Sequence, residues 1–206
     1  MDEPLSLTLL YTANIAGDLA LLPRLFTFLG RLKSEAGPLV LLLDLGRSCA
    51  DEVWHCRETG GRSALIALDG MGYHAANVAG ALDPETRDQL AEQVTMALVD
   101  ERRDWLYDSP LTECGIRSTL RPRDFERRLQ IVLSPADSMR IEGNALYLGA
   151  VGAGQVGAAV VDLRGAPALI SASARMLPPD TPPNPSIAGM VEFVEAEARY
   201  FARQAR

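Results

Sequence analysis

Histidine and cysteine are scarce in this chain of 206 residues, which has two histidines, His55 and His74, and three cysteines. Small secreted proteins that depend on disulfides are rich in cysteine, so this count does not predict a disulfide framework. An odd number of cysteines in a reducing compartment fits free thiols instead. We therefore expect Cys49, Cys56 and Cys114 to be unpaired.

Long apolar runs and an excess of positive charge are also missing. The longest apolar run, residues 38–45, is only as long as a strand, and the first ten residues lack the basic start and apolar stretch of a signal peptide. The formal charge is −7. Nucleic-acid backbones are bound by clustered lysine and arginine, so this charge argues against such a partner. We expect a cytoplasmic protein with no membrane and no nucleic-acid partner.

The hydrophobic pattern predicts an α/β protein. Apolar runs of strand length at residues 7–12 and 38–44 are separated by a helical repeat for which Asp18 is the expected N-cap. This order is typical of a right-handed crossover between parallel strands. We read residues 46–61 as a long loop. Further strands are expected at residues 73–78, 94–99 and 129–133, and further helices at 63–68 and 84–93.

The pattern changes in the second half of the chain. Short strands with little helix between them, at residues 145–149, 157–163 and 168–174, suggest an antiparallel sheet. Prolines at 178–185 indicate an extended connector, after which Ser186 is expected to cap a final helix. Residues 101–126 show no hydrophobic pattern that predicts a helix or a strand. The expected architecture is layered, with mixed parallel and antiparallel sheets and flanking helices.

Three of these strands run into glycine-bearing turns, in the segments YTANIAG, LLLDLGRS and MGYHAANVAGAL. In this order the segments resemble the catalytic domain of the 5'-nucleotidase family of calcineurin-like metallophosphoesterases. The first turn matches at Thr12 and Gly17, and the second at Asp44 and Gly46. The third segment matches the family at Gly72, Tyr73 and Ala75. The resemblance implies a metallophosphoesterase-like fold in one domain, 1–206, with the family's C-terminal nucleotide-specificity domain absent.

The positions where the resemblance places metal ligands carry other residues. Asn14 stands where the family has an aspartate, Ala16 where it has a histidine, and Arg47 where an aspartate bridges two metal ions. Gly80 and Ala81 replace an asparagine ligand and a histidine. A permanent cation at position 47 opposes metal binding, so we expect no metal cofactor and no catalytic residues. Asp44 is then expected to pair with Arg47 or to cap a neighbouring turn.

These substitutions predict an inactive relative of the 5'-nucleotidase family that acts as a binding, scaffold or regulatory module. Its expected partner is an unknown protein or a small anionic ligand. Two alternatives stay open. The first is a divergent hydrolase whose rebuilt site uses Asp44, Cys49, His55, Cys56 and His74, with Cys114 as a further metal ligand. The second is a thiol or zinc sensor at Cys49 and Cys56, since sulfur and imidazole suit zinc. Buried free cysteines are also ordinary small hydrophobes.

Overall fold

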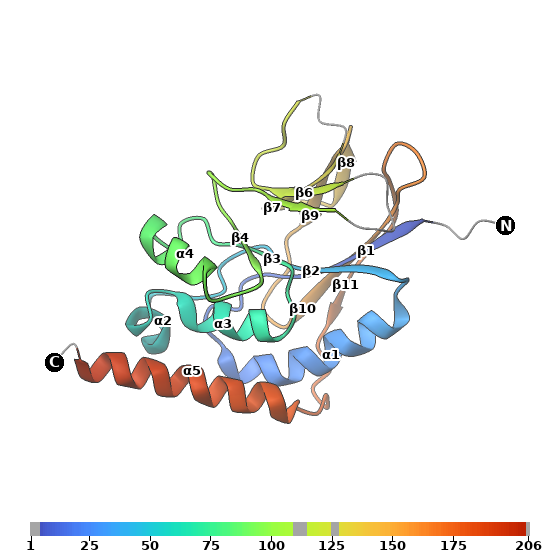
Figure 1. Cartoon of the computed structure of the whole chain (residues 1–206). Coiled ribbons are helices and arrows are strands. Elements are labelled where there is room, and N and C mark those ends of the chain that lie inside the picture. Colours follow the sequence, from blue (N-terminus) through green and yellow to red (C-terminus); the bar gives the residue numbers. More distant parts are fainter. Residues whose placement is uncertain (1–4, 109–114, 125–127, 205–206) are drawn as a thin grey trace.

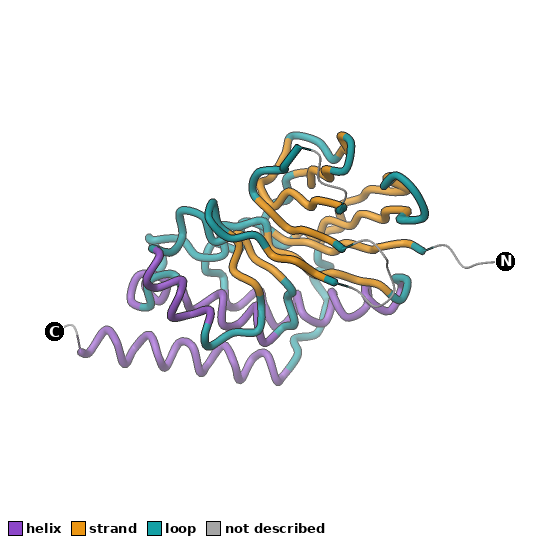
Figure 2. Tube along the Cα trace, turned by 45° about the horizontal axis from the view of Figure 1, so that its top comes forward, coloured by secondary structure: helices purple, strands orange, loops and turns teal. Residues whose placement is uncertain are grey.

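Two β-sheets lie face to face, and most of the helices cover the outer face of the larger sheet (Figure 1). The structure is a computed structural model that describes residues 5–108, 115–124 and 128–204. Figure 2 shows the same layers from a second direction, with the strands of both sheets above the helices. Within the described residues, no helix combines the length and apolar character needed to cross a lipid bilayer.

The larger sheet has six strands, and its centre is parallel. β1 pairs in parallel with β2, β2 with β3 and β3 with β4, whereas β10 and β11 add antiparallel strands on the other side. The order across the sheet is β11 (Ala168–Met176), β10 (Gln155–Asp162), β1 (Ser6–Thr12), β2 (Leu39–Asp44), β3 (Ala75–Asn77) and β4 (Ala97–Val99). The expected mixture of parallel and antiparallel strands is confirmed.

The smaller sheet has five strands and is also mixed. Its order is β5 (Trp105–Tyr107), β6 (Ile116–Thr119), β7 (Leu129–Ala136), β9 (Ala145–Gly149) and β8 (Arg140–Glu142). β7 pairs in parallel with both β6 and β9. The expectation of a purely antiparallel second half is therefore wrong for β9. The hairpin with β8 reverses the chain so that β9 returns alongside β7 in the same direction.

The helices are η1 (Leu19–Leu21), α1 (Leu22–Glu35), α2 (Trp54–Glu58), α3 (Arg62–Gly70), α4 (Pro84–Ala91) and α5 (Pro185–Gln204). The long helix α5 runs under α1, α2 and α3 in Figure 1. It buries Ile187, Val194 and Ala198 there.

Two hydrophobic cores hold the layers together because side chains alternate along each strand. On β1, Leu10 faces the helices and packs with Leu25 and Leu68 in the first core. Its neighbours Leu9 and Tyr11 face the smaller sheet and pack with Ile131 in the second core, as do the other inward residues of β7 and β9. The centre of the larger sheet is thus buried on both faces, which explains the continuous apolar runs of β1 and β2.

Several sequence expectations about individual elements need correction. The predicted loop at residues 46–61 contains the short helix α2. The helix expected at residues 63–68 runs from Arg62 to Gly70. The final helix begins at Pro185, and the Asn184 side chain accepts hydrogen bonds from the N–H groups of Ser186 and Ile187. Asn184 is therefore the cap, not Ser186. The part of residues 101–126 that the structure describes holds β5 and β6.

Candidate functional site

The parallel strands β1, β2 and β3 end at one edge of the larger sheet, where α/β proteins place their functional side chains. The turns after β1 and β2 are joined there by backbone hydrogen bonds. Asn14 N–H donates to the Gly46 carbonyl at 3.0 Å, and Ala16 N–H donates to the Arg47 carbonyl at 2.8 Å. Gly17 N–H donates to the Ser48 carbonyl, also at 2.8 Å. The two turns are therefore held against each other, and we call residues 13–17 and 44–48 together the ledge.

Three residues of this ledge have left-handed backbone conformations that side chains with a Cβ rarely adopt. Their φ angles are 57° at Asn14, 52° at Ala16 and 58° at Arg47. Asparagine tolerates this region, whereas alanine and arginine do so at a cost of about 1–2 kcal/mol each. These are the only non-glycine residues with positive φ among those described, and all three are positions where the resemblance places ligands. Strain of this kind concentrates at functional sites.

Asp44 is the one carboxylate of the ledge, and its hydrogen-bonding capacity is used inside the protein. It is completely buried at the end of β2. Its oxygens accept from Ser48 Oγ at 2.6 Å, from Gly46 N–H at 3.0 Å and from Thr12 Oγ1 at 3.3 Å. Burial raises the pKa of Asp44 to about 6, while these three hydrogen bonds act to lower it. Asp44 therefore caps the turn that follows it, which confirms one of the two roles expected for it.

The alternative role, an ion pair between Asp44 and Arg47, is wrong. Arg47 is exposed, and in the described part of the chain its side chain makes no ion pair and no hydrogen bond. Ser48 takes a hydrogen-bonding position at Asp44 instead, with its Oγ 2.6 Å from the carboxylate. The Arg47 guanidinium is thus exposed at the turn, whereas the Asp44 carboxylate is buried.

Thr12 and Tyr73, which match the family pattern, extend the hydrogen bonds around Asp44. The single Thr12 hydroxyl hydrogen is directed to Asp44, so the Tyr73 hydroxyl donates to Thr12 Oγ1 at 2.8 Å. Burial raises the pKa of Tyr73, and the negative charge of Asp44 acts in the same direction. Tyr73 therefore stays protonated and serves as a fixed donor.

The other positions where the resemblance places ligands also face inward or carry no functional group. Asn14 Nδ2 donates to the Val151 carbonyl at 2.8 Å, so its amide ties the first turn to the segment before β10. Ala16 offers only a methyl group. Gly80 and Ala81 are exposed in the turn after β3.

Sequence reasoning missed Ser48 and Asn77. Asn77 Nδ2 lies 3.2 Å from the Leu45 carbonyl and 3.3 Å from the Leu133 carbonyl, and so links β2 and β7. Ser48 could have been found as a polar residue four positions after Asp44, and Asn77 as a polar residue at the end of β3.

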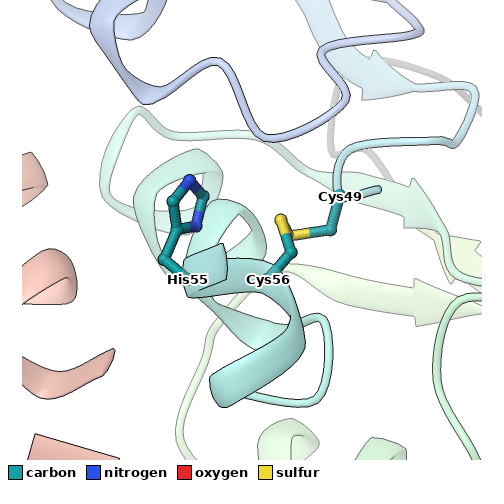
Figure 3. Close-up of side chains that lie close together, drawn as sticks. All are labelled: Cys49, His55 and Cys56. Atoms are coloured by element: carbon teal, nitrogen blue, oxygen red, sulfur yellow. A yellow bond between two sulfur atoms is a disulfide. The ribbon is translucent and has the colours of Figure 1, made fainter. Parts of the chain in front are cut away.

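Cys49, His55 and Cys56 form a second cluster next to the ledge, shown in Figure 3. One ligand atom from each of these residues lies within 4.8 Å of the others, and this is the one such group of three among the described His, Cys, Asp and Glu residues. Cys49 and Cys56 are joined by a disulfide with Cα atoms 5.6 Å apart. The expectation of free thiols is therefore wrong for this pair, because α2 turns the chain back and brings Cys56 to Cys49.

His74 and Cys114 do not extend this cluster. His74 Nδ1 accepts from the Leu42 N–H at 3.0 Å, in the middle of the larger sheet. Burial, with the charge of Lys33 acting in the same direction, lowers the pKa of His74. Cys114 lies outside the described residues. The rebuilt site expected from Asp44, the cysteines and both histidines is thus not assembled among the described residues, which bring only Cys49, His55 and Cys56 together.

Comparisons with known proteins bear on the fold. No protein-family model and no curated protein sequence matches this chain. Solved structures do match. The Haemophilus influenzae NAD nucleotidase (NadN) superposes with a TM-score of 0.65 and 8% identity, over 97% of this chain and 61% of that one. The Bacillus subtilis calcineurin-like phosphoesterase YfkN gives 0.62 and 9%, over 97% of this chain and 99% of that one.

The chain has the calcineurin-like phosphoesterase fold. A putative 5'-nucleotidase from Staphylococcus aureus supports this assignment, with a TM-score of 0.61 and 8% identity over 93% of this chain and 58% of that one. The fold that the sequence resemblance implies is confirmed. The chain spans about three fifths of both nucleotidase structures, and the phosphoesterase fold is what they share with it.

The ledge of this phosphoesterase fold does not fit a pair of divalent metal ions. Such a pair is held by several carboxylate, imidazole and amide ligands. Here one carboxylate is buried and hydrogen-bonded, one amide is directed at a backbone carbonyl, and the remaining positions offer methyl, glycine and guanidinium groups. Arg47 adds a positive charge that repels cations. The donor set and the charge both disagree with the metal chemistry of the family.

Proposed function

We propose that this protein uses the phosphoesterase fold as a metal-free binding or regulatory module and does not hydrolyse phosphoesters. The observation that carries the proposal is the state of Asp44, which is completely buried and accepts hydrogen bonds from Thr12, Gly46 and Ser48. These bonds use three of the roughly four acceptor positions of a carboxylate, and the group has no exposed surface through which a cation from solvent could reach it. The other ledge positions supply no replacement ligands.

Arg47 supports an anionic ligand as the partner of this module. Its guanidinium is exposed at the edge where the parallel strands end, and it offers a planar set of donors suited to phosphate or carboxylate. The Asn14–Gly46 and Ala16–Arg47 backbone hydrogen bonds hold the turn that carries it. A small anionic molecule, or an acidic group on a protein, is the chemistry that this arrangement would recognise.

The first test is hydrolysis. Purified protein is incubated with Mn²⁺ or Zn²⁺ and with AMP or bis(p-nitrophenyl) phosphate, in the presence and absence of chelator. We expect no chelator-sensitive phosphate or nitrophenol release, and no stoichiometric metal by elemental analysis. Chelator-sensitive turnover that is lost in Asp44→Asn would overturn the proposal in favour of a rebuilt metal-dependent hydrolase.

The second test concerns Arg47. Calorimetry with inorganic phosphate and AMP is expected to show binding to the wild type that weakens about tenfold to a hundredfold in Arg47→Ala, since a charge-assisted contact is worth about 1.5–3 kcal/mol. Arg31→Ala is the matched control, because Arg31 is also exposed but lies on α1. Equal binding by wild type and Arg47→Ala would refute the role of Arg47.

A further inference from the structure

The two residues of the Cys49 and Cys56 disulfide differ in burial. Cys49 follows the second ledge turn and is half-buried, whereas Cys56 lies on α2 with 2% of its surface exposed. Cys49 is therefore the residue of the pair that a reagent from solvent can approach, and Cys56 is shielded. This difference is the arrangement needed for an attacking thiol and a resolving thiol.

His55 is held in one orientation between two partners. Its Nε2 lies 2.9 Å from the Gly17 carbonyl oxygen, and its Nδ1 lies 2.8 Å from Ser63 Oγ. A carbonyl oxygen only accepts, so the proton of the neutral ring is on Nε2, and Nδ1 accepts from the Ser63 hydroxyl. His55 is 4% exposed and Ser63 is completely buried, which shields both bonds from water.

Ser63 connects this imidazole to the sulfur atoms. Its Oγ lies 3.4 Å from Cys49 Sγ and 3.9 Å from Cys56 Sγ. Since Ser63 donates its hydrogen to His55, its oxygen can accept one from the Cys49 thiol of the reduced protein. Cys49, Ser63 and His55 then form a continuous path for the thiol proton.

We propose that Cys49 and Cys56 are a thiol–disulfide exchange site that reacts with small-molecule disulfides, with Cys49 as nucleophile and His55 and Ser63 as positioning residues. In the reduced protein the Cys49 proton passes to Ser63 as the Ser63 proton passes to His55 Nδ1. The Cys49 thiolate attacks a disulfide R–S–S–R, the S–S bond breaks, and the leaving thiolate takes a proton.

Cys56 completes the exchange. Its thiolate attacks Cys49 Sγ in the mixed disulfide, which releases the second R–S⁻ as a thiol once it takes up a proton. The sum is two protein thiols plus one disulfide giving the Cys49–Cys56 disulfide plus two small thiols. Two electrons pass from the protein to the small molecule, and the reverse reaction restores the dithiol.

The disulfide is in direct contact with the ledge, which gives the exchange a structural consequence. A Cβ added at Gly17 would lie 2.8 Å from Cys56 Sγ, so the first turn packs against this sulfur. Gly17 also donates to the Ser48 carbonyl and accepts from His55. Cys49 directly follows Ser48, so a change at the sulfur atoms reaches both turns of the ledge.

Zinc is the competing occupant of the same cluster, and the contacts disfavour it. A structural zinc site takes four ligands, whereas the described cluster offers three. Both ring nitrogens of His55 already have protein partners, so binding a metal would break the bond to Gly17 or to Ser63. Thiol chemistry leaves both bonds in place.

The test uses the full chain with Cys114→Ser, so that thiol counts report only on the pair. The protein is equilibrated in mixtures of reduced and oxidised glutathione, then alkylated and weighed by mass spectrometry. We expect a reversible two-electron conversion between zero and two alkylated thiols. In the Cys56→Ser variant a glutathione adduct should accumulate on Cys49, whereas Cys49→Ser should form little adduct on the buried Cys56.

The opposite pattern, with Cys56 as the labelled residue, would overturn the proposal. The proposal would also be overturned if the Cys49–Cys56 pair stayed fully oxidised, or fully reduced, in every mixture of reduced and oxidised glutathione. Stoichiometric zinc retained by the reduced protein and lost in Cys49→Ser would assign the cluster to the metal instead.

The relay is tested separately by the rate at which iodoacetamide alkylates Cys49. Ser63→Ala should slow this rate about tenfold or more near neutral pH, because it removes the proton path to His55. At high pH the rates of variant and wild type should converge, which a merely structural effect would not produce. Ser118→Ala is the matched control, since Ser118 is a completely buried serine on β6 in the other sheet. Equal pH profiles for Ser63→Ala and Ser118→Ala would remove Ser63 and His55 from the mechanism.

Discussion

At the scale of single residues, Asp44 decides how the ledge responds to pH. Its carboxyl is completely buried, and the three hydrogen bonds that it accepts offset the loss of hydration only in part. Folding therefore raises its pKa from 3.8 to about 6. The folded protein therefore binds a proton at this site more tightly than the unfolded chain. Protonation of Asp44 stabilises the fold, and ionisation destabilises it.

The first prediction follows from that sign. The contribution of Asp44 to the free energy of unfolding is fully present below about pH 4 and is lost as pH rises to about 6 and above. The loss amounts to about 3 kcal/mol. Urea unfolding of wild type and Asp44→Asn from pH 4 to pH 7 checks it, because other titrating groups cancel in the difference. A difference that does not change with pH would show that Asp44 titrates normally.

Sequence reasoning found the residues of the ledge that belong to its turns and missed those that act across it. Thr12, Asp44 and Tyr73 sit in local motifs and were predicted. Ser63 was not, because its role depends on distances to Cys49 and His55 that arise only on folding. Ser48 was also missed, although it lies only four residues after Asp44 and bonds it locally. The expected pair between Asp44 and Arg47 does not form, because Thr12, Gly46 and Ser48 donate to the carboxylate instead.

At the scale of elements, the start of α5 shows how a cap is chosen. Asn184 and Ser186 are both residue types that cap helices. Pro185 prefers the first helical position because it has no N–H to lose and its φ is fixed near the helical value. Asn184 then stands directly before the helix, and its Oδ1 accepts from Ser186 N–H at 3.0 Å and from Ile187 N–H at 3.1 Å.

The second prediction compares these two positions. Asn184→Ala should lower the free energy of unfolding by about 1 kcal/mol, because two N–H groups at the start of α5 lose their acceptor. Ser186→Ala is the control and should change it by less than ~0.5 kcal/mol. Thermal or urea unfolding measures both values. A larger loss in Ser186→Ala than in Asn184→Ala would return the cap to Ser186.

The elements that the sequence missed are short and lack local signals. Helix α2 has five residues, and its N-cap, Val53, makes no side-chain hydrogen bond. The strand β8 has three residues, none of them fully buried. Both elements depend on tertiary contacts, because α2 packs on α3 and α5 and β8 pairs with β9. Longer elements with buried apolar faces, such as β1, β2 and α1, were predicted to within a few residues.

At the scale of the whole molecule, the same fold is formed by very different sequences. Superpositions on solved structures cover nearly the whole chain at only 8–9% identity. The two cores that stabilise the fold are built from apolar side chains between the layers, and the ledge turns contribute Ala13, Ile15 and Leu45 to them. Substitutions at the ledge positions outside these cores can therefore accumulate without loss of the fold.

The backbone of the ledge gives the last prediction. Asp and His, the residue types that the resemblance places at positions 14, 16 and 47, tolerate left-handed backbone better than Ala and Arg do. The triple variant Asn14→Asp, Ala16→His, Arg47→Asp should therefore fold, and it removes the positive charge while adding three metal-binding groups. We expect it to bind Mn²⁺ at least about tenfold more tightly than the wild type, a gain of ~1.4 kcal/mol.

Calorimetric titration with Mn²⁺ measures this gain, and circular dichroism verifies that each protein is folded. Arg47→Ala alone is the control, because it removes the positive charge without adding a ligand, and it should show little of the gain. A folded triple variant that binds no more Mn²⁺ than the wild type would mean that the ledge itself, and not only its side chains, has moved away from a metal-binding geometry. The left-handed turns at Ala16 and Arg47 would then not be explained by a metal-binding geometry.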